Sequence, residues 1–236
     1  MNDPIAPFFS GSAAMEWNNA GVALLSRNDC SQATLKMAMA ALESGLSICQ
    51  RTLLIMPDIA PSPQCENLPI SIEALSTSTE QALQQRHFVY TNAFKIRAVE
   101  TLPRLETASA CIIFNLALAK HIQGLQDNST SSLVQATKLY ALVLHISIRN
   151  SNPSELNATA LLLSAVALNN RGAILSSVGQ MDAARECYGN LIPLLPFLDR
   201  HCSKDSALGA GLEAIADTAI SIVYEVNMDQ KAAPAA

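Results

Sequence analysis

Apolar residues recur three and four positions apart along most of the chain, between short polar or proline-containing stretches. This spacing places them on one face of an α-helix, so the pattern predicts a mainly α protein. Pro193 and Pro196 are expected to bend one helix, because proline lacks the N–H that a helix interior needs. The helices are expected over residues 12–27, 31–50, 106–124, 131–149, 154–179, 181–201 and 205–227.

The stretch over residues 51–104 has a different pattern. Four prolines in its first part interrupt any regular element, so residues 57–85 are expected to form a mobile loop. Bulky and smaller or polar residues then alternate from Phe88 to Arg97, which is the period of a β-strand. The sequence predicts a strand here, or a hairpin that turns at Thr91–Asn92, with residues 52–56 as the pairing partner.

A short unit, N-N-x-G-x-x-L, occurs twice, at residues 18–24 and 169–175. Small and large residues follow both glycines at equal spacings, and a third copy carries Ala117 in place of the glycine. The residues that follow in the three copies are Ala33, Met37 and Ala40; Ala136, Tyr140 and Val143; and Ala184, Tyr188 and Leu191. Such self-similarity is typical of proteins built from stacked helical repeats.

With Trp17 and Leu168 each four residues before a glycine, this pattern resembles the tetratricopeptide-repeat (TPR) family. The resemblance implies an array of antiparallel helix hairpins, an α–α superhelix, in which Gly21 and Ala33 let paired helices approach while Trp17 and Met37 fill the adjoining gaps. The implied organisation comprises helix pairs at 12–50, 105–150 and 154–201, a loop and small β-hairpin insertion at 51–104, a closing helix at 205–227 and a disordered tail at 228–236. Because the glycine-equivalent positions are 96 and 55 residues apart, this would be a degenerate array with insertions.

Asparagines stand at the same place in all three copies. In TPR proteins the first helix of each unit lines a concave groove that holds peptides, so the resemblance places these side chains in such a groove. A carboxamide offers two donors and an acceptor, which suits the main chain of an extended ligand. The alternative is that the amides bond to neighbouring helices and fix the register of the units. The residues expected to bind a partner are Asn18, Asn19, Asn115, Asn169 and Asn170.

Composition limits the partners and the compartment. The net charge of −5 argues against binding to nucleic acid or to an anionic membrane. Half of the residues are hydrophobic and only 15% are charged, which suggests that a protein partner or a second copy covers some apolar surface. The scattered cysteines, the lack of a secretory signal and the shortness of the apolar run at 158–168 favour an intracellular, cytoplasmic protein without a membrane span.

No catalytic or metal-binding motif is recognisable. His121 and His145 have no carboxylate or thiol at helical ligand spacing, and a hydrolase would need them to meet acidic residues of the insertion. We therefore expect no cofactor, no metal and no enzymatic activity. The favoured function is an interaction scaffold that binds a peptide or partner protein, and the alternative is a regulatory module that senses a small ligand or peptide.

Overall fold

The apolar periodicity folds into helices that cover most of the chain in a computed structural model. The structure describes residues 11–27, 31–55, 70–75, 89–99, 102–148, 158–201 and 207–232. The helices are α1 (Gly11–Leu25), α2 (Gln32–Ile55), α4 (Leu102–Gln126), α5 (Thr130–Ile148), α6 (Ala158–Ser177), α7 (Met181–Leu191), α8 (Leu195–His201) and α9 (Ala207–Ala232). The two strands are β1 (Ile70–Glu73) and β2 (Ala93–Ile96). The mainly α prediction is confirmed, as is a small two-stranded sheet.

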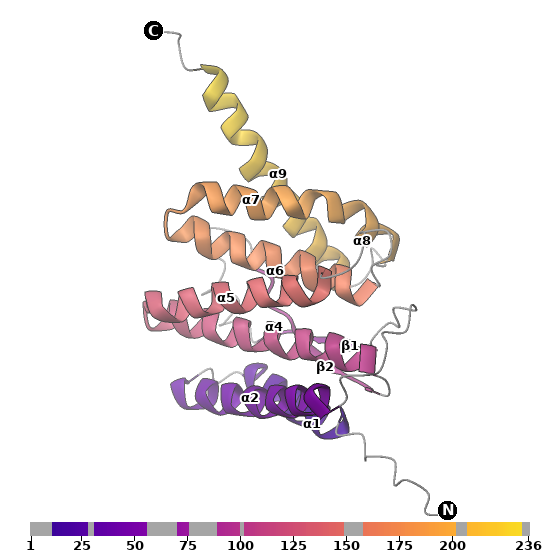
Figure 1. The fold of residues 1–236 in the computed structure, drawn as a ribbon. Helices are drawn as coiled ribbons and strands as arrows, with labels where there is room; N and C mark the ends of the chain where they lie inside the picture. The colour runs from indigo at the N-terminus through magenta and orange to yellow at the C-terminus, as the bar shows by residue number, and fades with distance from the viewer. Residues whose placement is uncertain are drawn as a thin grey trace, which may run out of the picture.

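The helices stack in pairs along the molecule (Figure 1). The pairs are α1 with α2, α4 with α5, and α6 with α7. The second helix of each pair also contacts the next pair, α2 against α4 and α5 against α6, and α7 packs against α9. Because neighbours in sequence are neighbours in space, the apolar face of each helix is covered by the elements nearest to it along the chain.

Two tight connections make this pairing possible. Asn128, between α4 and α5, has φ 48°, a left-handed conformation that asparagine tolerates better than most residues. Gly179, after α6, has φ 79°, and the N–H of Gln180 donates to the carbonyl of Leu175 over 2.8 Å. This arrangement ends the helix with a glycine in the left-handed region.

Small residues allow close contact within the pairs, as expected in the third pair. A Cβ on Gly172 would lie 2.8 Å from the ring of Tyr188, and Ala184 is fully buried. In the second pair Ala136 and Tyr140 are also fully buried. The small-and-large pattern therefore describes real helix contacts in both pairs.

The register assigned to the first pair is wrong. Ala33 is exposed and 60% of Met37 is exposed, so these residues do not pack against α1. Instead a Cβ on Gly21 would meet Leu42 at 2.7 Å and the carbonyl oxygen of Ala38 at 3.1 Å. Ala38 and Leu42 are five positions later in α2 than the residues expected there, because Ala33 lies in the first turn of that helix.

Trp17 and Ala40 also differ from expectation. Trp17 is 46% exposed and does not fill an inter-helix gap, and Ala40 is exposed on α2. Instead Gly45, one turn after Leu42 in α2, lies close to α1. A Cβ on Gly45 would lie 3.1 Å from the carbonyl oxygen of Ala14. The first pair thus shares the packing principle of the others and differs in the length of its connection.

The strand that pairs with β2 differs from the one that the sequence predicted. Residues 52–55 belong to α2, so they do not pair with the strand, and β1 lies within the predicted loop at 57–85. β1 and β2 are antiparallel, with Ile70 opposite Ile96 and Glu73 opposite Ala93. Residues 89–92 lead into β2 without a turn at Thr91–Asn92. The alternation in this segment therefore predicted the strand correctly, while the pairing depended on contacts between distant residues.

The bend predicted in the late helices is confirmed, whereas the disordered tail predicted to begin at residue 228 is partly wrong. A 3-10 turn at Ile192–Leu194 separates α7 from α8, where proline interrupts the helix. α9 continues to Ala232, beyond the expected end at 227 and into the segment expected to be disordered. Residues 233–236 lie outside the described residues, as do residues 154–157 of the helix expected over 154–179.

Two helices, 104–126 and 158–177, are long and apolar enough to cross a membrane by length and composition. In their most apolar windows, however, 83% and 89% of the residues are buried inside the protein. Core helices pass the same test, because a helix surrounded by others is apolar on all sides. α4 and α6 occupy this central position, between the first pair and α7.

Candidate functional site

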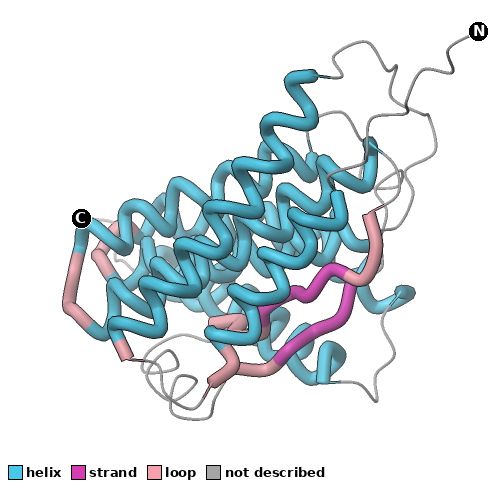
Figure 2. Tube along the Cα trace, turned by 90° about the horizontal axis from the view of Figure 1, so that it is seen from below, coloured by secondary structure: helices cyan, strands magenta, loops and turns pink. Residues whose placement is uncertain are grey.

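One extended segment crosses the first helices of all three pairs. β2 lies against α1 and α4, and the residues that precede it reach α6. Figure 2 shows the two strands beside the helices. A Cβ on Gly211 of α9 would lie 3.3 Å from the ring of Tyr90, and one on Gly11 of α1 would lie 3.1 Å from Val99. The segment over residues 90–96, called the resident segment below, therefore runs from the third pair to the first.

Three asparagines each bind both main-chain polar groups of one residue in the resident segment. The N–H of Ile96 donates to Asn19 Oδ1 over 2.9 Å, and Asn19 Nδ2 donates to the carbonyl oxygen of Ile96 over 2.8 Å. Asn115 holds Phe94 in the same way, at 2.9 and 2.8 Å. Asn170 holds Tyr90 at 2.7 and 2.9 Å. We call these three asparagine–residue contacts the carboxamide clamps.

Asn18 and Asn169 orient the clamps. Asn18 Nδ2 donates to the carbonyl oxygen of Phe94 over 2.9 Å and to Asn19 Oδ1 over 3.1 Å. Asn18 Oδ1 in turn accepts from Asn115 Nδ2 over 2.9 Å, a bond between α1 and α4. Asn169 Nδ2 donates to Asn170 Oδ1 over 3.1 Å. The amide group of each clamp is thus fixed by a neighbouring amide as well as by the main chain that it binds.

The geometry of an extended chain explains why a carboxamide fits. The N–H and C=O of one residue point to the same edge of a strand, and alternate residues point to opposite edges. Phe94 and Ile96 turn these groups toward the asparagines, which leaves Ala93 and Lys95 to face β1 across the sheet. A carboxamide presents one acceptor and one donor side by side, so it satisfies the edge as a neighbouring strand would.

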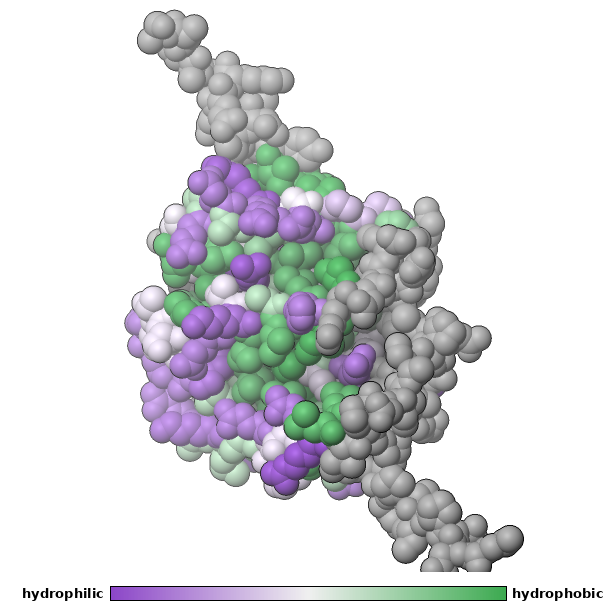
Figure 3. Space-filling view, in the orientation of Figure 1, coloured by the Kyte–Doolittle hydropathy of each residue, from purple (hydrophilic) through white to green (hydrophobic). Residues whose placement is uncertain are grey.

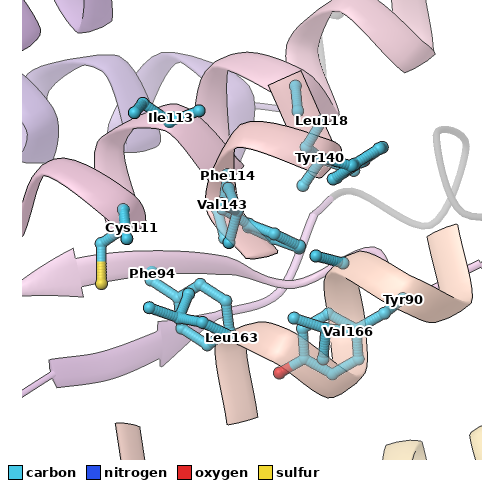
Figure 4. Close-up of a cluster of buried hydrophobic side chains, with 14 of the residues drawn as sticks. Tyr90, Phe94, Cys111, Ile113, Phe114, Leu118, Tyr140, Val143, Leu163 and Val166 are labelled. Atoms are coloured by element: carbon cyan, nitrogen blue, oxygen red, sulfur yellow. The ribbon is translucent and has the colours of Figure 1, made fainter. Parts of the chain in front are cut away.

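The side chains of the resident segment enter an aromatic cluster (Figure 4). Tyr90, Phe94 and Phe114 pack together with ring centroids 5.1 to 6.3 Å apart, and Phe114 lies 5.6 Å from Tyr140. All four rings are fully buried. Asn170 Nδ2 also donates to the hydroxyl of Tyr140 over 3.2 Å, so the clamp on α6 is bonded to the second helix pair. Burial raises the pKa of Tyr140 and keeps this hydroxyl neutral.

His121 belongs to the edge of the same cluster. Its ring lies 6.3 Å from that of Tyr140, only 2% of the residue is exposed, and burial lowers its pKa to about 3. His145 is exposed on α5. In the part of the chain that the structure describes, three or more His, Cys, Asp and Glu side chains do not gather anywhere in a group that could hold a metal ion.

All five predicted asparagines are therefore aligned along one side of the helix stack. Four of them bond to main chain, as the groove hypothesis requires, while Asn169 bonds to Asn170. Asn18 and Asn115 also bond to each other across helices, as the alternative requires. The main chain that they hold belongs to the protein itself, and partner binding stays a prediction. Sequence reasoning placed Tyr140 in the packing pattern of its copy but did not connect it with the asparagines, and it missed Phe114.

Comparisons with protein-family models, curated proteins and solved structures found no match for this chain.

Proposed function

We propose that this protein is a non-enzymatic interaction scaffold of the TPR type, whose groove along α1, α4 and α6 binds an extended segment of a partner. Two features support the family. The contacts of Gly172 with Tyr188 and of Gly21 with Leu42 repeat one packing scheme, and the helices stack in consecutive pairs. The asparagines of the groove occupy matching places on the first helix of each pair.

The observation that carries the proposal is the set of carboxamide clamps. Asn19, Asn115 and Asn170 lie on three different helices, and together they bind one continuous extended chain. Their ligand is main chain, which every peptide possesses, and the amides carry no charge. Such a site recognises the extended conformation itself and leaves the choice of sequence to the side-chain contacts.

The surface supports a partner as well. On the face shown in Figure 3, apolar residues form green areas between the polar ones. Large apolar side chains that are at least one-third exposed occur on several helices. The chain has few charged residues, so charge repulsion does little to oppose association through these surfaces. These residues are Trp17, Met37, Leu54, Val134, Leu142, Ile148, Val178, Met181 and Ile220. We propose that a partner protein or a second copy covers part of this surface.

Site-specific photo-crosslinking tests the groove. Glu16 is exposed on α1, three residues before Asn19 and on the same side of the helix, so a photoreactive phenylalanine analogue at this position would reach a partner in the groove. The matched control carries the same analogue at Met37, which is exposed on α2. We expect a protein from cell extract to crosslink from position 16 and not from position 37.

A second variant makes the result specific. Asn170→Ala removes the clamp on α6, away from the crosslinker on α1, and should lower the yield at position 16 at least fivefold while circular dichroism shows unchanged helicity. Equal yields from positions 16 and 37, or a yield that Asn170→Ala leaves unchanged, would show that partners bind elsewhere.

A further inference from the structure

The resident segment occupies the groove as a bound peptide would. On the edge that faces the helices, its main-chain groups bond to the side chains of Asn18 and Asn19 of α1, Asn115 of α4 and Asn170 of α6. Each helix pair contributes side-chain amides to this site, as a repeat protein can do for a separate peptide. The difference from a complex is that this ligand is supplied by the loop between α2 and α4.

The clamped residues carry the large enclosed side chains of the resident segment. Tyr90 and Phe94 are fully buried and Ile96 is 1% exposed, so an aromatic residue, a second aromatic four positions later and an aliphatic residue two positions after that fill the groove. Lys95 lies between them with its side chain 32% exposed, paired with Glu73 at 2.9 Å, and Arg97 is exposed. Thr91 and Ala93 are buried as well, so shape selects large apolar side chains at the clamped positions and small ones at 91 and 93.

We propose that the resident segment is an internal competitor for the groove, and that the external partner supplies an extended peptide with the same spacing, aromatic-x3-aromatic-x-aliphatic, which displaces it. This inference rests on the proposed function, because it names the ligand of the same groove and the way its binding is regulated. The incoming peptide would run from α6 to α1, since Tyr90 is held by α6 and Ile96 by α1.

Because the resident segment is part of the chain, an external peptide needs a higher affinity to displace it. An external peptide with the same side chains exchanges equal contacts for equal contacts, so the exchange is opposed mainly by the high effective concentration of a segment that belongs to the same chain. A partner must therefore bind better than the resident segment does, or the resident segment must be weakened first. The groove would reject weak extended peptides that its neutral, main-chain-directed clamps would otherwise accept.

A peptide titration tests the exchange. The probe is a fluorescein-labelled peptide with the sequence of residues 89–99, VYTNAFKIRAV, and its anisotropy is followed with the full chain. In the double variant Tyr90→Ala/Phe94→Ala the resident segment lacks two enclosed rings that the probe can replace. We expect the probe to bind this variant at least tenfold more tightly than the unaltered protein.

A chemically matched probe tests the clamps. Methylation of the main-chain nitrogen at the position of Phe94 deletes the N–H that donates to Asn115 Oδ1 and keeps every side chain. This probe should bind the double variant at least tenfold more weakly than the unmodified one. Equal affinities of the two probes would mean that the peptide is bound outside the clamps, and would overturn the inference.

The remaining outcomes separate this inference from the proposed function. Equal affinity of the unmodified probe for the double variant and the unaltered protein would show that no competitor has to leave. A helical double variant that binds no probe would show that the groove does not accept this spacing. Either result overturns the inference, while partner crosslinking from position 16 would still support the scaffold.

Hydrogen exchange on the unaltered protein covers the case in which the double variant unfolds. If the resident segment leaves the groove, the amides of Tyr90, Phe94 and Ile96 exchange through a local opening, at least tenfold faster than the central amides of α4 and α6. Exchange of these three amides at the same rate as those of α4 would show that the segment is released only by global unfolding. The competitor role would then be wrong.

Discussion

At the scale of single residues, burial determines how much each clamp contributes. Asn170 and Asn115 are fully buried, so water cannot replace them when they are removed, whereas Asn19 is only half-buried. A buried N–H or C=O left without a partner costs about 1–3 kcal/mol. The clamps are chemically alike, but their environments predict different energies.

Removal of the α6 clamp should therefore be the more damaging change. Asn170→Ala leaves the N–H and C=O of Tyr90 and the hydroxyl of Tyr140 without this partner. We expect the free energy of unfolding to fall by roughly 2–5 kcal/mol, from the cost of two or more buried groups. Asn19→Ala, the matched control, should cost less than half as much. Urea denaturation followed by circular dichroism measures both, and equal losses would contradict the assignment.

Buried His121 predicts a loss of stability in acid. The folded protein binds a proton there only near pH 3, while the unfolded chain does so near the ordinary value of 6.5. The unfolded state binds more protons between these values, so stability falls as the pH drops from about 6.5 toward 3, by about 1.4 kcal/mol per pH unit. Between pH 7 and pH 5 the loss should be about 2 kcal/mol.

His121→Leu should remove this dependence, because the apolar side chain has no proton to bind, whereas His145→Ala should retain it. Urea denaturation of the three proteins at pH 7 and pH 5 provides the measurement. An unaltered slope in His121→Leu would mean that another group causes the loss in acid.

At the scale of elements, most of the helices could be predicted from the sequence, but the residues by which paired helices contact each other could be predicted only in part. Periodicity located every helix pair, and proline correctly predicted the break after α7. The spacing that succeeded for Ala184 failed for Ala33, since local pattern does not fix the number of residues in the connection that precedes α2. The asparagines were recognisable as suited to extended main chain, but the segment that they hold is 76 to 80 residues away from three of them. Contacts of that separation leave no periodic signal.

The stability that β2 contributes should depend much more on the burial of Phe94 than on the ion pair of Lys95. Phe94 is fully buried among aromatic rings, and Phe94→Ala should cost about 3–5 kcal/mol from lost contacts and the cavity that remains. The next residue provides the control. Lys95 pairs with Glu73 in a partly exposed position, so Lys95→Ala should change the free energy of unfolding by less than about 1 kcal/mol. Thermal unfolding of the two variants distinguishes these effects, and a comparable loss in both would contradict the enclosure of Phe94.

Replacement by alanine of two glycines on facing helices should change the free energy of unfolding in opposite directions. A methyl group on Gly172 would lie 2.8 Å from the ring of Tyr188, so Gly172→Ala should destabilise the protein by about 1–3 kcal/mol. Gly189 on α7 has no neighbour within 4 Å of an added Cβ, and Gly189→Ala should stabilise it by about 0.5–1 kcal/mol through helix propensity. Destabilisation by both, measured from urea midpoints, would show that α7 does not pack as described.

At the scale of the whole molecule, the resident segment connects parts that a helix stack alone would leave loosely coupled. In a stack of repeats each unit contacts only its neighbours, so the ends can unfold separately. Here one extended segment is clamped by α1, α4 and α6, which spans all three pairs. The clamps therefore add a contact that reaches beyond nearest neighbours, and they should make unfolding more cooperative.

The single tryptophan allows this coupling to be measured. Trp17 lies on α1 beside Asn18 and Asn19, so its fluorescence reports the first pair, while circular dichroism reports all helices. In the unaltered protein the two urea transitions should coincide, because the segment ties the first pair to the third. Asn19→Ala releases Ile96 from α1 and keeps the bond between Asn18 and Asn115, and the fluorescence midpoint should then fall below that of the circular dichroism. Asn170→Ala releases the opposite end, so the two midpoints should separate with the fluorescence transition at the higher urea concentration. Coincident midpoints in both variants would mean that direct packing between the pairs, rather than the resident segment, makes the fold cooperative.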